Sequence, residues 1–247
     1  MFDASLPPKI SRYYCIKRYI DFILVFFIAL VLAPLILFFV LLVFLTSRGP
    51  IFYSQIRCGK NGKPFKMYKI RSMIVGAETD GITWAQDDDQ RVTKVGQVMR
   101  KLHIDELVQL YNVLRGEMAL VGPRPERPEF VEVLRERVPC YEYRMLVLPG
   151  MSGLSQLNYS ADTGLEDVHR KLILDMEYIE DASFGLDMRM LAGTFLQFLC
   201  TKFSKSLPLK IFGVYRTAET SHWVNRIGLL NQHQPIILPQ QNNKKLK

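Results

Sequence analysis

The chain has 247 residues, enough for one sizeable domain with attached segments, and 32 Lys and Arg against 24 Asp and Glu give a formal net charge of +8. This excess favours an anionic partner, for which nucleic acid, phosphorylated metabolites and acidic lipid are the alternatives. The four cysteines lie far apart without a Cys-x-x-Cys pair. That spacing argues against a disulfide framework or a zinc site and is typical of a reducing compartment.

Residues 19–46 are almost wholly apolar, interrupted only by Asp21 near the start. About 20 apolar residues suffice to span a bilayer, so this run predicts a membrane segment. A cleaved signal peptide is disfavoured, because the run is too long and no small-residue cleavage pattern follows it.

The membrane segment has basic residues on both sides, whereas a spanning helix is expected to show a charge imbalance. Pro34 lies near its middle, where a proline removes a backbone hydrogen bond and bends a helix. Two halves of about 14 residues, each about 21 Å long, are long enough to enter a bilayer about 30 Å thick and return. We therefore expect a re-entrant helix broken at Pro34 with both ends cytoplasmic, and a kinked spanning helix is the alternative. The basic flanks are Lys9, Arg12, Lys17 and Arg18 before the segment, and Arg48, Arg57, Lys60, Lys63, Lys66, Lys69 and Arg71 after it.

After the membrane segment and its basic N-terminal flank (residues 1–48), residues 49–200 predict a small, mostly helical domain of the α/β (α+β) class. Short strands at 51–55 and 65–70, joined by a Gly/Asn/Pro turn, are expected to form a hairpin. Apolar spacing predicts helices near 91–101, 102–114, 129–137, 168–180 and 186–199, and a strand and turn at 146–153. In the first of these helices the residues expected to face inward are Val92, Val95, Val98 and Met99.

Residues 201–247 form a C-terminal tail in which aromatic and aliphatic residues alternate with basic ones. This pattern predicts either an amphipathic attachment to the membrane interface or a helix packed on the domain. Residues 231–247 are rich in Gln, Asn and Lys, a composition typical of disorder.

Two adjacent carboxylates, Asp105 and Glu106, stand near the start of the predicted 102–114 helix, where free backbone N–H groups favour anions. Neighbouring residues on a helix face different directions, which favours two separate roles over one symmetric pair. An acidic first turn on an ordinary helix is the simpler alternative. The same stretch ends in a rigid, basic turn at Pro123, Arg124 and Pro125.

Several polar blocks, in chain order over roughly residues 15–199, together resemble the bacterial sugar transferases, which are monotopic polyprenyl-phosphate phosphoglycosyltransferases. The membrane element of that family is a re-entrant helix broken at a proline, which Pro34 matches. The segment 126–130 and the Tyr159–Ser160 pair with its following insertion resemble the exopolysaccharide-type branch. The matching residues are Lys17, Arg18, Asp21, Gly49, Pro50, Gln55, Arg57, Lys69 to Met73, Asp105 to Leu107, Gln109, Asn112 to Met118, Val121 to Glu126, Pro149, Gly150, Gly153, Lys171, Asp175, Tyr178 and Ile179.

The resemblance implies an undecaprenyl-phosphate sugar phosphotransferase. Such an enzyme moves a sugar 1-phosphate from a UDP-sugar to polyprenyl phosphate, releases UMP and begins a repeat unit of exopolysaccharide, capsule or O-antigen. It implies that Asp105 is the nucleophile that holds the phosphosugar covalently, and that Glu106 is a ligand of Mg²⁺. A carboxylate is already ionised at pH 7 and needs no general base, and a pyrophosphate needs a cation to neutralise its developing charge.

Four basic residues are candidates for holding the substrate phosphates: Lys69, Arg71, Arg100 and Arg124. An arginine fork meets two phosphate oxygens at once, and the prolines beside Arg124 restrict its backbone. His103 stands where the family usually has Ser or Thr, three residues before Glu106 in the N-cap position of a capping box. Histidine caps poorly, so we expect a helix start that is weaker by about 1 kcal/mol.

The implied location is the bacterial inner (plasma) membrane, with the catalytic domain on the cytoplasmic face and membrane lipids as neighbours. A non-catalytic membrane adaptor that binds anionic lipid or partner proteins is the alternative function. Nucleic acid is not expected as a partner, because the basic residues cluster near the membrane exit and no recognition motif appears. The sequence names neither the sugar nor the oligomeric state, for which a homodimer is one alternative.

Overall fold

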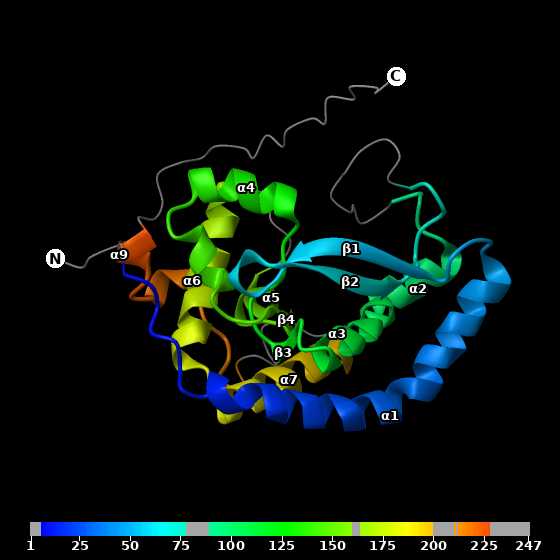
Figure 1. The fold of residues 1–247 in the computed structure, drawn as a ribbon, viewed down its shortest axis with the longest axis horizontal. Helices are drawn as coiled ribbons and strands as arrows, with labels where there is room; N and C mark the ends of the chain where they lie inside the picture. The colour runs from blue at the N-terminus through cyan, green and yellow to red at the C-terminus, as the bar shows by residue number, and fades with distance from the viewer. Residues whose placement is uncertain (1–5, 78–88, 160–163, 200–209, 211, 228–247) are drawn as a thin grey trace, which may run out of the picture.

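A computed structural model describes residues 6–77, 89–159, 164–199, 210 and 212–227. Figure 1 shows a mixed helical and stranded domain with one long helix, α1, running along its edge. The described elements in chain order are α1 (Tyr14–Thr46), β1 (Phe52–Cys58), the 3₁₀ turn η1 (Lys60–Gly62), β2 (Pro64–Ile70), α2 (Lys94–Lys101), η2 (Ile104–Gln109), α3 (Leu110–Leu114), β3 (Ala119–Val121), α4 (Pro128–Arg137), η3 (Tyr141–Met145), β4 (Gly150–Ser152), α5 (Leu154–Asn158), α6 (Leu165–Asp181), α7 (Phe184–Leu199), η4 (Ala218–Thr220) and α9 (Val224–Ile227).

Helix α1 has 33 residues and is long and apolar enough to cross a membrane, which fits the predicted membrane anchor. It continues through Pro34, where the sequence predicted a break. Figure 1 shows that its axis changes direction partway along its length. A proline removes one hydrogen bond and pushes the preceding turn aside, so a bent but uninterrupted helix is the local outcome. Most large side chains along it are exposed, among them Phe27, Leu30, Val31, Leu37, Phe44 and Leu45.

A buried polar cluster fixes the N-terminal half of α1 to the domain. Lys17 forms ion pairs with Asp187 of α7 and, at 3.2 Å, with Asp21. Asp21 in turn accepts a hydrogen bond from the backbone N–H of Leu120 at 3.3 Å, and Asp187 accepts one from the Tyr178 hydroxyl at 2.7 Å. Because buried charges are costly unless they are paired, this cluster specifies where the helix docks.

The C-terminal half of α1 docks on the same domain through apolar contacts. Phe39 and Val43 are buried in a cluster with Ile70 of β2, Met99 of α2 and Ile104 of η2. Both halves of α1 therefore contact one domain, while the exposed apolar side chains between them have no protein cover in the described structure.

The predicted hairpin is confirmed: β1 and β2 pair antiparallel, from Phe52 opposite Ile70 to Cys58 opposite Pro64. The outer edge of β2 is covered by the side-chain amide of Asn112 on α3. The Asn112 amide donates to the Lys66 carbonyl at 2.7 Å and accepts from the Tyr68 N–H at 3.2 Å, as a neighbouring strand would. This contact joins α3, and with it the preceding η2, to the strand that carries Lys69.

A second, parallel pair of short strands lies deeper in the domain, with Ala119 opposite Gly150 and Val121 opposite Ser152. Of the strand and turn predicted at 146–153, only Gly150–Ser152 is a strand, β4, and β3 is too short to show any periodicity. Gly122 and Gly150 approach so closely that a Cβ on Gly150 would collide with the backbone of Gly122. The two glycines therefore allow the backbone that leads into Pro123 to lie against β4.

Helices α4, α6 and α7 confirm three predicted helices. Helix α2 begins at Lys94 because Thr93 caps it: the Thr93 hydroxyl accepts a hydrogen bond from the Gly96 N–H at 2.9 Å. The prediction that Val98 faces inward was wrong, because this residue is 48% exposed. The single helix predicted over 102–114 was also wrong: η2 and α3 replace it. His103 has φ of 47°, and this left-handed residue ends the path of α2 before η2 begins.

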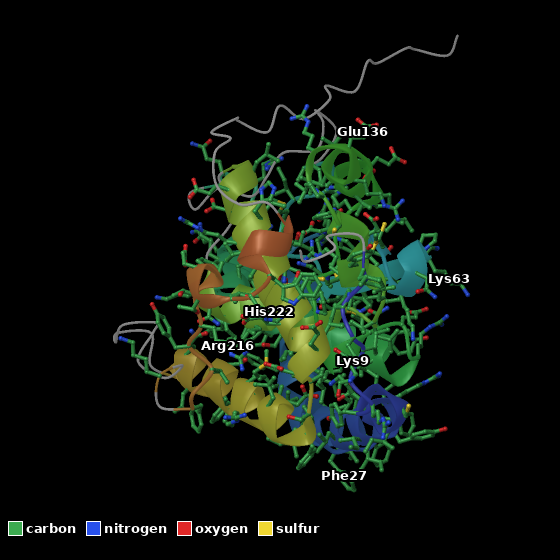
Figure 2. The ribbon with its side chains drawn as sticks, turned by 90° about the vertical axis from the view of Figure 1, so that its left-hand side faces the viewer. Lys9, Phe27, Lys63, Glu136, Arg216 and His222 are labelled. Carbon is green, nitrogen blue, oxygen red and sulfur yellow. The ribbon has the colours of Figure 1, made fainter. Side chains whose placement is uncertain are left out.

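The described part of the C-terminal tail packs on the domain, as in the second of the two alternatives for this segment. Val214, Ala218 and Trp223 are fully buried, and the indole N–H of Trp223 donates to Glu180 of α6 at 3.1 Å. Figure 2 shows the orange segment of Arg216 and His222 against the yellow helices. Residues 231–247, predicted to be disordered, lie outside the described residues.

Candidate active site

The two adjacent carboxylates lie on η2, between the end of α2 and the start of α3. His103 occupies the N-cap position of η2, and its side chain makes no capping hydrogen bond there, as expected for histidine. Asp105 is buried, with 6% of its surface exposed, while the Glu106 side chain is 20% exposed. The two side chains thus meet different surroundings, which fits two separate roles.

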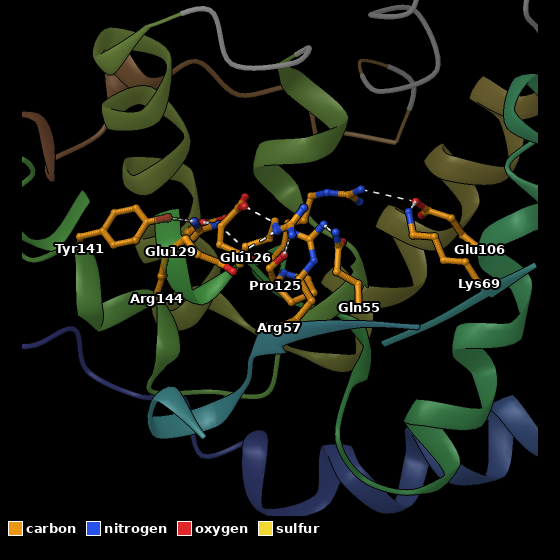
Figure 3. Close-up of polar contacts among 12 residues, drawn as sticks. Gln55, Arg57, Lys69, Glu106, Pro125, Glu126, Glu129, Tyr141 and Arg144 are labelled. Carbon is orange, nitrogen blue, oxygen red and sulfur yellow. Dashed lines mark hydrogen bonds and ion pairs between the residues drawn. The ribbon is translucent and has the colours of Figure 1, made fainter. Parts of the chain in front are cut away.

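Glu106 is held by two cations from other elements (Figure 3). Its Oε1 atom lies 2.7 Å from Nζ of Lys69 on β2 and 3.4 Å from Nη2 of Arg124 in the Pro123–Pro125 turn. Burial by itself would raise the pKa of Glu106, but the charges of Lys69 and Arg124 outweigh it and lower the pKa well below its usual range. Glu106 is therefore an ionised carboxylate at neutral pH.

Asp105 has a different environment. Within the described residues no hydrogen bond or ion pair reaches its carboxylate. Burial raises the pKa of Asp105 above its ordinary value, and the charges of Lys69 and Arg100 offset only part of that rise. A largely buried carboxylate with no such bond is a stronger nucleophile than a fully hydrated one, because less of a water shell must be removed first.

The Pro123–Pro125 turn is held by two arginines that bond its backbone (Figure 3). Arg144 donates from Nη2 to the Arg124 carbonyl at 3.1 Å, and Arg57 on β1 donates from Nη1 to the Pro125 carbonyl at 3.2 Å. The Arg124 side chain is 42% exposed at its position over Glu106. The turn is rigid through its prolines and its carbonyls, so Arg124 projects from a fixed base.

Arg144 is a residue that the sequence did not single out. Its Nη2 atom lies 2.9 Å from Oδ2 of Asp175, which is 1% exposed, and Oδ1 of Asp175 accepts from the Ser155 hydroxyl at 2.7 Å. The only signal for Arg144 in the sequence was its position as a single basic residue before the apolar run at 145–149. This buried pair connects the core of α6 with the turn that carries Arg124.

The four predicted phosphate ligands divide into two groups. Lys69 and Arg124 meet at Glu106, and Arg100 lies close enough to act on the charge of Asp105 while its Nε donates to Ser72 at 3.0 Å. Arg71 instead turns to the end of α1, where Nη2 donates to the Ser47 carbonyl at 2.7 Å. The structure thus does not bring Arg71 to Glu106.

A metal site in this region would have few protein ligands. Within the described residues no group of three or more His, Cys, Asp and Glu side chains could hold a metal ion. Mg²⁺ bound together with substrate phosphates usually takes only one or two carboxylates. Glu106 fits that mode, because only its Oε1 atom is engaged by cations in the described structure.

The comparison with known proteins places this chain in a family. The family model of the bacterial sugar transferases matches residues 12–201, more than three quarters of the chain. The chain belongs to the bacterial sugar transferase family. The match takes in all of α1, the hairpin, both carboxylates and the Pro123–Pro125 turn.

Three relatives show what this sugar transferase is similar to. A UDP-N-acetylgalactosamine-undecaprenyl-phosphate N-acetylgalactosaminephosphotransferase of Aeromonas hydrophila is 41% identical over 185 residues, covering 75% of this chain and 43% of that protein. A UDP-glucose:undecaprenyl-phosphate glucose-1-phosphate transferase of Escherichia coli (strain K12) is 38% identical, covering 71% of this chain and 38% of that protein. Exopolysaccharide production protein PSS of Rhizobium leguminosarum bv. phaseoli is 37% identical, covering 72% of this chain and 92% of that protein. The chain therefore spans less than half of the first two relatives.

Proposed function

We propose that this sugar transferase moves a sugar 1-phosphate from a UDP-sugar to polyprenyl (undecaprenyl) phosphate through a covalent intermediate on Asp105. UMP leaves in the first step, and the product begins a repeat unit of exopolysaccharide, capsule or O-antigen. One observation carries the proposal: Asp105 is a buried carboxylate with no hydrogen bond or ion pair within the described residues, and it stands beside a carboxylate that two cations hold. The names of the relatives above add support for the donor and acceptor classes.

In the first step an Asp105 oxygen attacks the β-phosphorus of the UDP-sugar. The bond between that phosphorus and the bridging oxygen breaks, the electron pair leaves with UMP, and an acyl phosphate joins Asp105 to the sugar. In the second step an oxygen of polyprenyl phosphate attacks the same phosphorus. This frees the Asp105 carboxylate and leaves the sugar on a polyprenyl diphosphate. Neither step needs a general base, because both nucleophiles are already anions.

The cations around Glu106 have a separate task in this scheme. Arg124 and Lys69 present donors to phosphate oxygens from two sides, while Glu106 fixes where their side chains lie. Mg²⁺, when bound, neutralises pyrophosphate oxygens as charge develops on the leaving UMP. Glu106, with its unengaged oxygen, is the protein ligand that we assign to it.

We also propose that α1 enters and leaves the membrane on the cytoplasmic side of the bacterial inner membrane. The support is that both halves of α1 dock on one domain, through Lys17 at one end and Val43 at the other. A straight spanning helix would carry one of these ends about 30 Å away across the bilayer. Docking of both ends leaves the exposed middle to enter the lipid, near the plane of the acceptor phosphate.

Release of UMP tests the proposed activity. Purified protein is incubated with Mg²⁺, undecaprenyl phosphate and each of a panel of UDP-sugars, with Asp105→Asn as the control. We expect one or a few sugars to give sustained UMP release that requires the polyprenyl phosphate and is lost in the control. Equal turnover by the Asp105→Asn variant would contradict the proposal.

Protease access tests the proposed topology. Tags at both termini are probed by proteolysis in sealed inside-out vesicles. We expect both tags to be cut, and protection of one tag would show a spanning helix.

A further inference from the structure

A second charged cavity lies away from the carboxylates. It has a volume of about 550 Å³ and lies between the N-terminal part of α1, the turn η1 and the loop from α3 to β3. That volume is within the range of small-molecule sites. Pro64 lines this cavity and Lys69 contacts Glu106. Lys69 lies five residue steps beyond Pro64 along β2, a distance of about 17 Å. The cavity is thus distinct from the site on η2.

Its lining carries five basic side chains, Lys17, Arg18, Lys60, Lys63 and Arg115, against the two acidic ones of Asp21 and Glu117. Two of the basic groups are neutralised: Lys17 pairs with Asp21 and Asp187, and Arg115 pairs with Glu117 at 3.0 Å.

Three cations remain, Arg18, Lys60 and Lys63. Their side chains are exposed and make no hydrogen bond or ion pair within the described residues. A cleft lined by positive charges raises the local concentration of anions.

Arg18 has a defined place at this cavity. Gly116 has a positive φ of 72°, and a Cβ there would come within 2.6 Å of Nη2 of Arg18. Glycine at this position therefore leaves the space that the guanidinium occupies. A guanidinium offers two parallel N–H groups to phosphate oxygens, whereas the ammonium groups of Lys60 and Lys63 act as point charges.

The surface beside the cavity is apolar. The residues that follow Arg18 along α1 include Tyr19, Phe22 and Ile23, each at least half exposed. Figure 2 shows Phe27 of α1 pointing out of the body at the edge of the molecule, and Lys63 on the side of the same body. A ligand with a phosphate and a hydrocarbon chain would match both surfaces, because its phosphate meets the cations and its chain lies along α1.

We propose that this cavity binds the phosphate of an anionic membrane lipid, with Arg18, Lys60 and Lys63 as its ligands. The proposal rests on the membrane placement of α1 proposed above, and it adds a lipid site that takes no part in the transfer reaction. Such a lipid would hold the N-terminal end of α1 at the headgroup plane.

Native mass spectrometry of the full chain in non-ionic detergent tests the proposal, with phosphatidylglycerol and phosphatidylcholine as probes. The site variant combines Arg18→Gln, Lys60→Gln and Lys63→Gln. The control variant combines Lys94→Gln, Lys101→Gln and Arg137→Gln, which removes the same charge from exposed positions elsewhere. We expect the wild type to retain one phosphatidylglycerol in preference to phosphatidylcholine. The site variant should bind it about tenfold more weakly or worse, and the control should stay close to wild type.

Equal weakening in both variants would show general surface attraction and overturn the proposal, as would unchanged binding in the site variant. Inorganic phosphate is the second arm: we expect it not to displace the lipid at equal concentration, and displacement would assign the cavity to a free phosphate compound. UMP release by the site variant should remain at the wild-type level. Loss of lipid with retained UMP release therefore separates this proposal from the proposed transfer activity.

Discussion

Lys69 on β2 and Glu106 on η2 form an ion pair with 2.7 Å between Nζ and Oε1, although 37 residues separate them in the chain. The pair joins the hairpin to the segment that holds Asp105. The charge of Lys69 acts on both carboxylates, lowering the pKa of Glu106 and opposing the rise that burial causes in the pKa of Asp105. One side chain thus helps to set the ionisation of the proposed nucleophile and of its neighbour.

Lys69→Gln should therefore move the pH profile of the reaction. Burial raises the pKa of Asp105 and the charge of Lys69 lowers it. Without Lys69 the pKa therefore rises further, and the carboxylate is protonated at higher pH. We expect the acid limb of kcat/KM to shift to higher pH. The measurement is UMP release between pH 5 and pH 9, in roughly half-unit steps. Lys66→Gln, an exposed change on the same strand, is the control and should leave the limb in place; an unmoved limb in Lys69→Gln would contradict this role.

Asp105→Asn should abolish turnover and also stabilise the protein at neutral pH. The folded-state pKa of Asp105 is raised, so between the unfolded value of about 3.9 and the folded value the native state binds more protons than the unfolded state. Stability is therefore lost as pH rises through that window, and the ionised carboxylate destabilises the fold above it. Asparagine removes this cost.

Thermal unfolding at two pH values measures the effect of Asp105→Asn. We expect a higher Tm than wild type at pH 7.5 and a smaller difference at the lowest pH at which the protein stays soluble. A lower Tm at pH 7.5 would contradict the placement of Asp105 as a desolvated, unpaired group.

The sequence was most informative where local chemistry decides local structure. The turn at Gly59 to Pro64 between two β-rich stretches predicts the hairpin, because those residues favour the turn and the register follows from it. The apolar spacing after Leu102 was misleading, because a 3₁₀ turn followed by a short α-helix replaces the single helix, and only Ile104, Leu110 and Val113 among its apolar residues are buried. What differs is the left-handed backbone at His103, a conformation that no side-chain pattern records.

The contacts that assemble the site are long-range, and the sequence could indicate their members but not their pairing. Lys69 and Arg124 were candidate phosphate ligands, and Lys69 reaches Glu106 from a strand whose edge Asn112 covers, while Arg124 reaches it from the Pro123–Pro125 turn. Arg71 was chosen by the same reasoning, yet its Nη2 group donates to Ser47 at the end of α1. Whether a basic residue reaches Glu106 depends on how the elements pack together, and the charge pattern of the sequence does not record that packing.

Asn112→Ala should destabilise the protein by about 3 kcal/mol, because three hydrogen bonds of about 1 kcal/mol each are lost. The side chain of Asn112 bonds the Lys66 carbonyl, the Tyr68 N–H and Glu117 Oε2. For a chain of this size such a loss lowers Tm by roughly 6–12 °C. Gln97→Ala, on the exposed side of α2, is the matched control and should change Tm little. Equal Tm values for the two variants would show that the amide does not hold the strand edge.

Arg144→Lys tests whether the buried pair with Asp175 positions Arg124. Lysine keeps the charge beside Asp175 but loses the planar fork that also bonds the Arg124 carbonyl. We expect kcat/KM for the UDP-sugar to fall about tenfold, or roughly 1.4 kcal/mol, chiefly through a higher KM, with a smaller change in Tm than in Asp175→Asn. Arg135→Lys, exposed on α4, is the control. A loss of Tm with unchanged KM would assign Arg144 a structural role alone.

The covalent step is tested most directly by mass spectrometry of the enzyme after incubation with UDP-sugar and Mg²⁺ in the absence of polyprenyl phosphate. We expect one phosphosugar adduct per chain, mapped to the peptide that contains Asp105 and released when polyprenyl phosphate is added. The Asp105→Asn variant should carry none. UMP release by the wild type without any adduct on Asp105, or an adduct mapped to another residue, would contradict a covalent intermediate on Asp105.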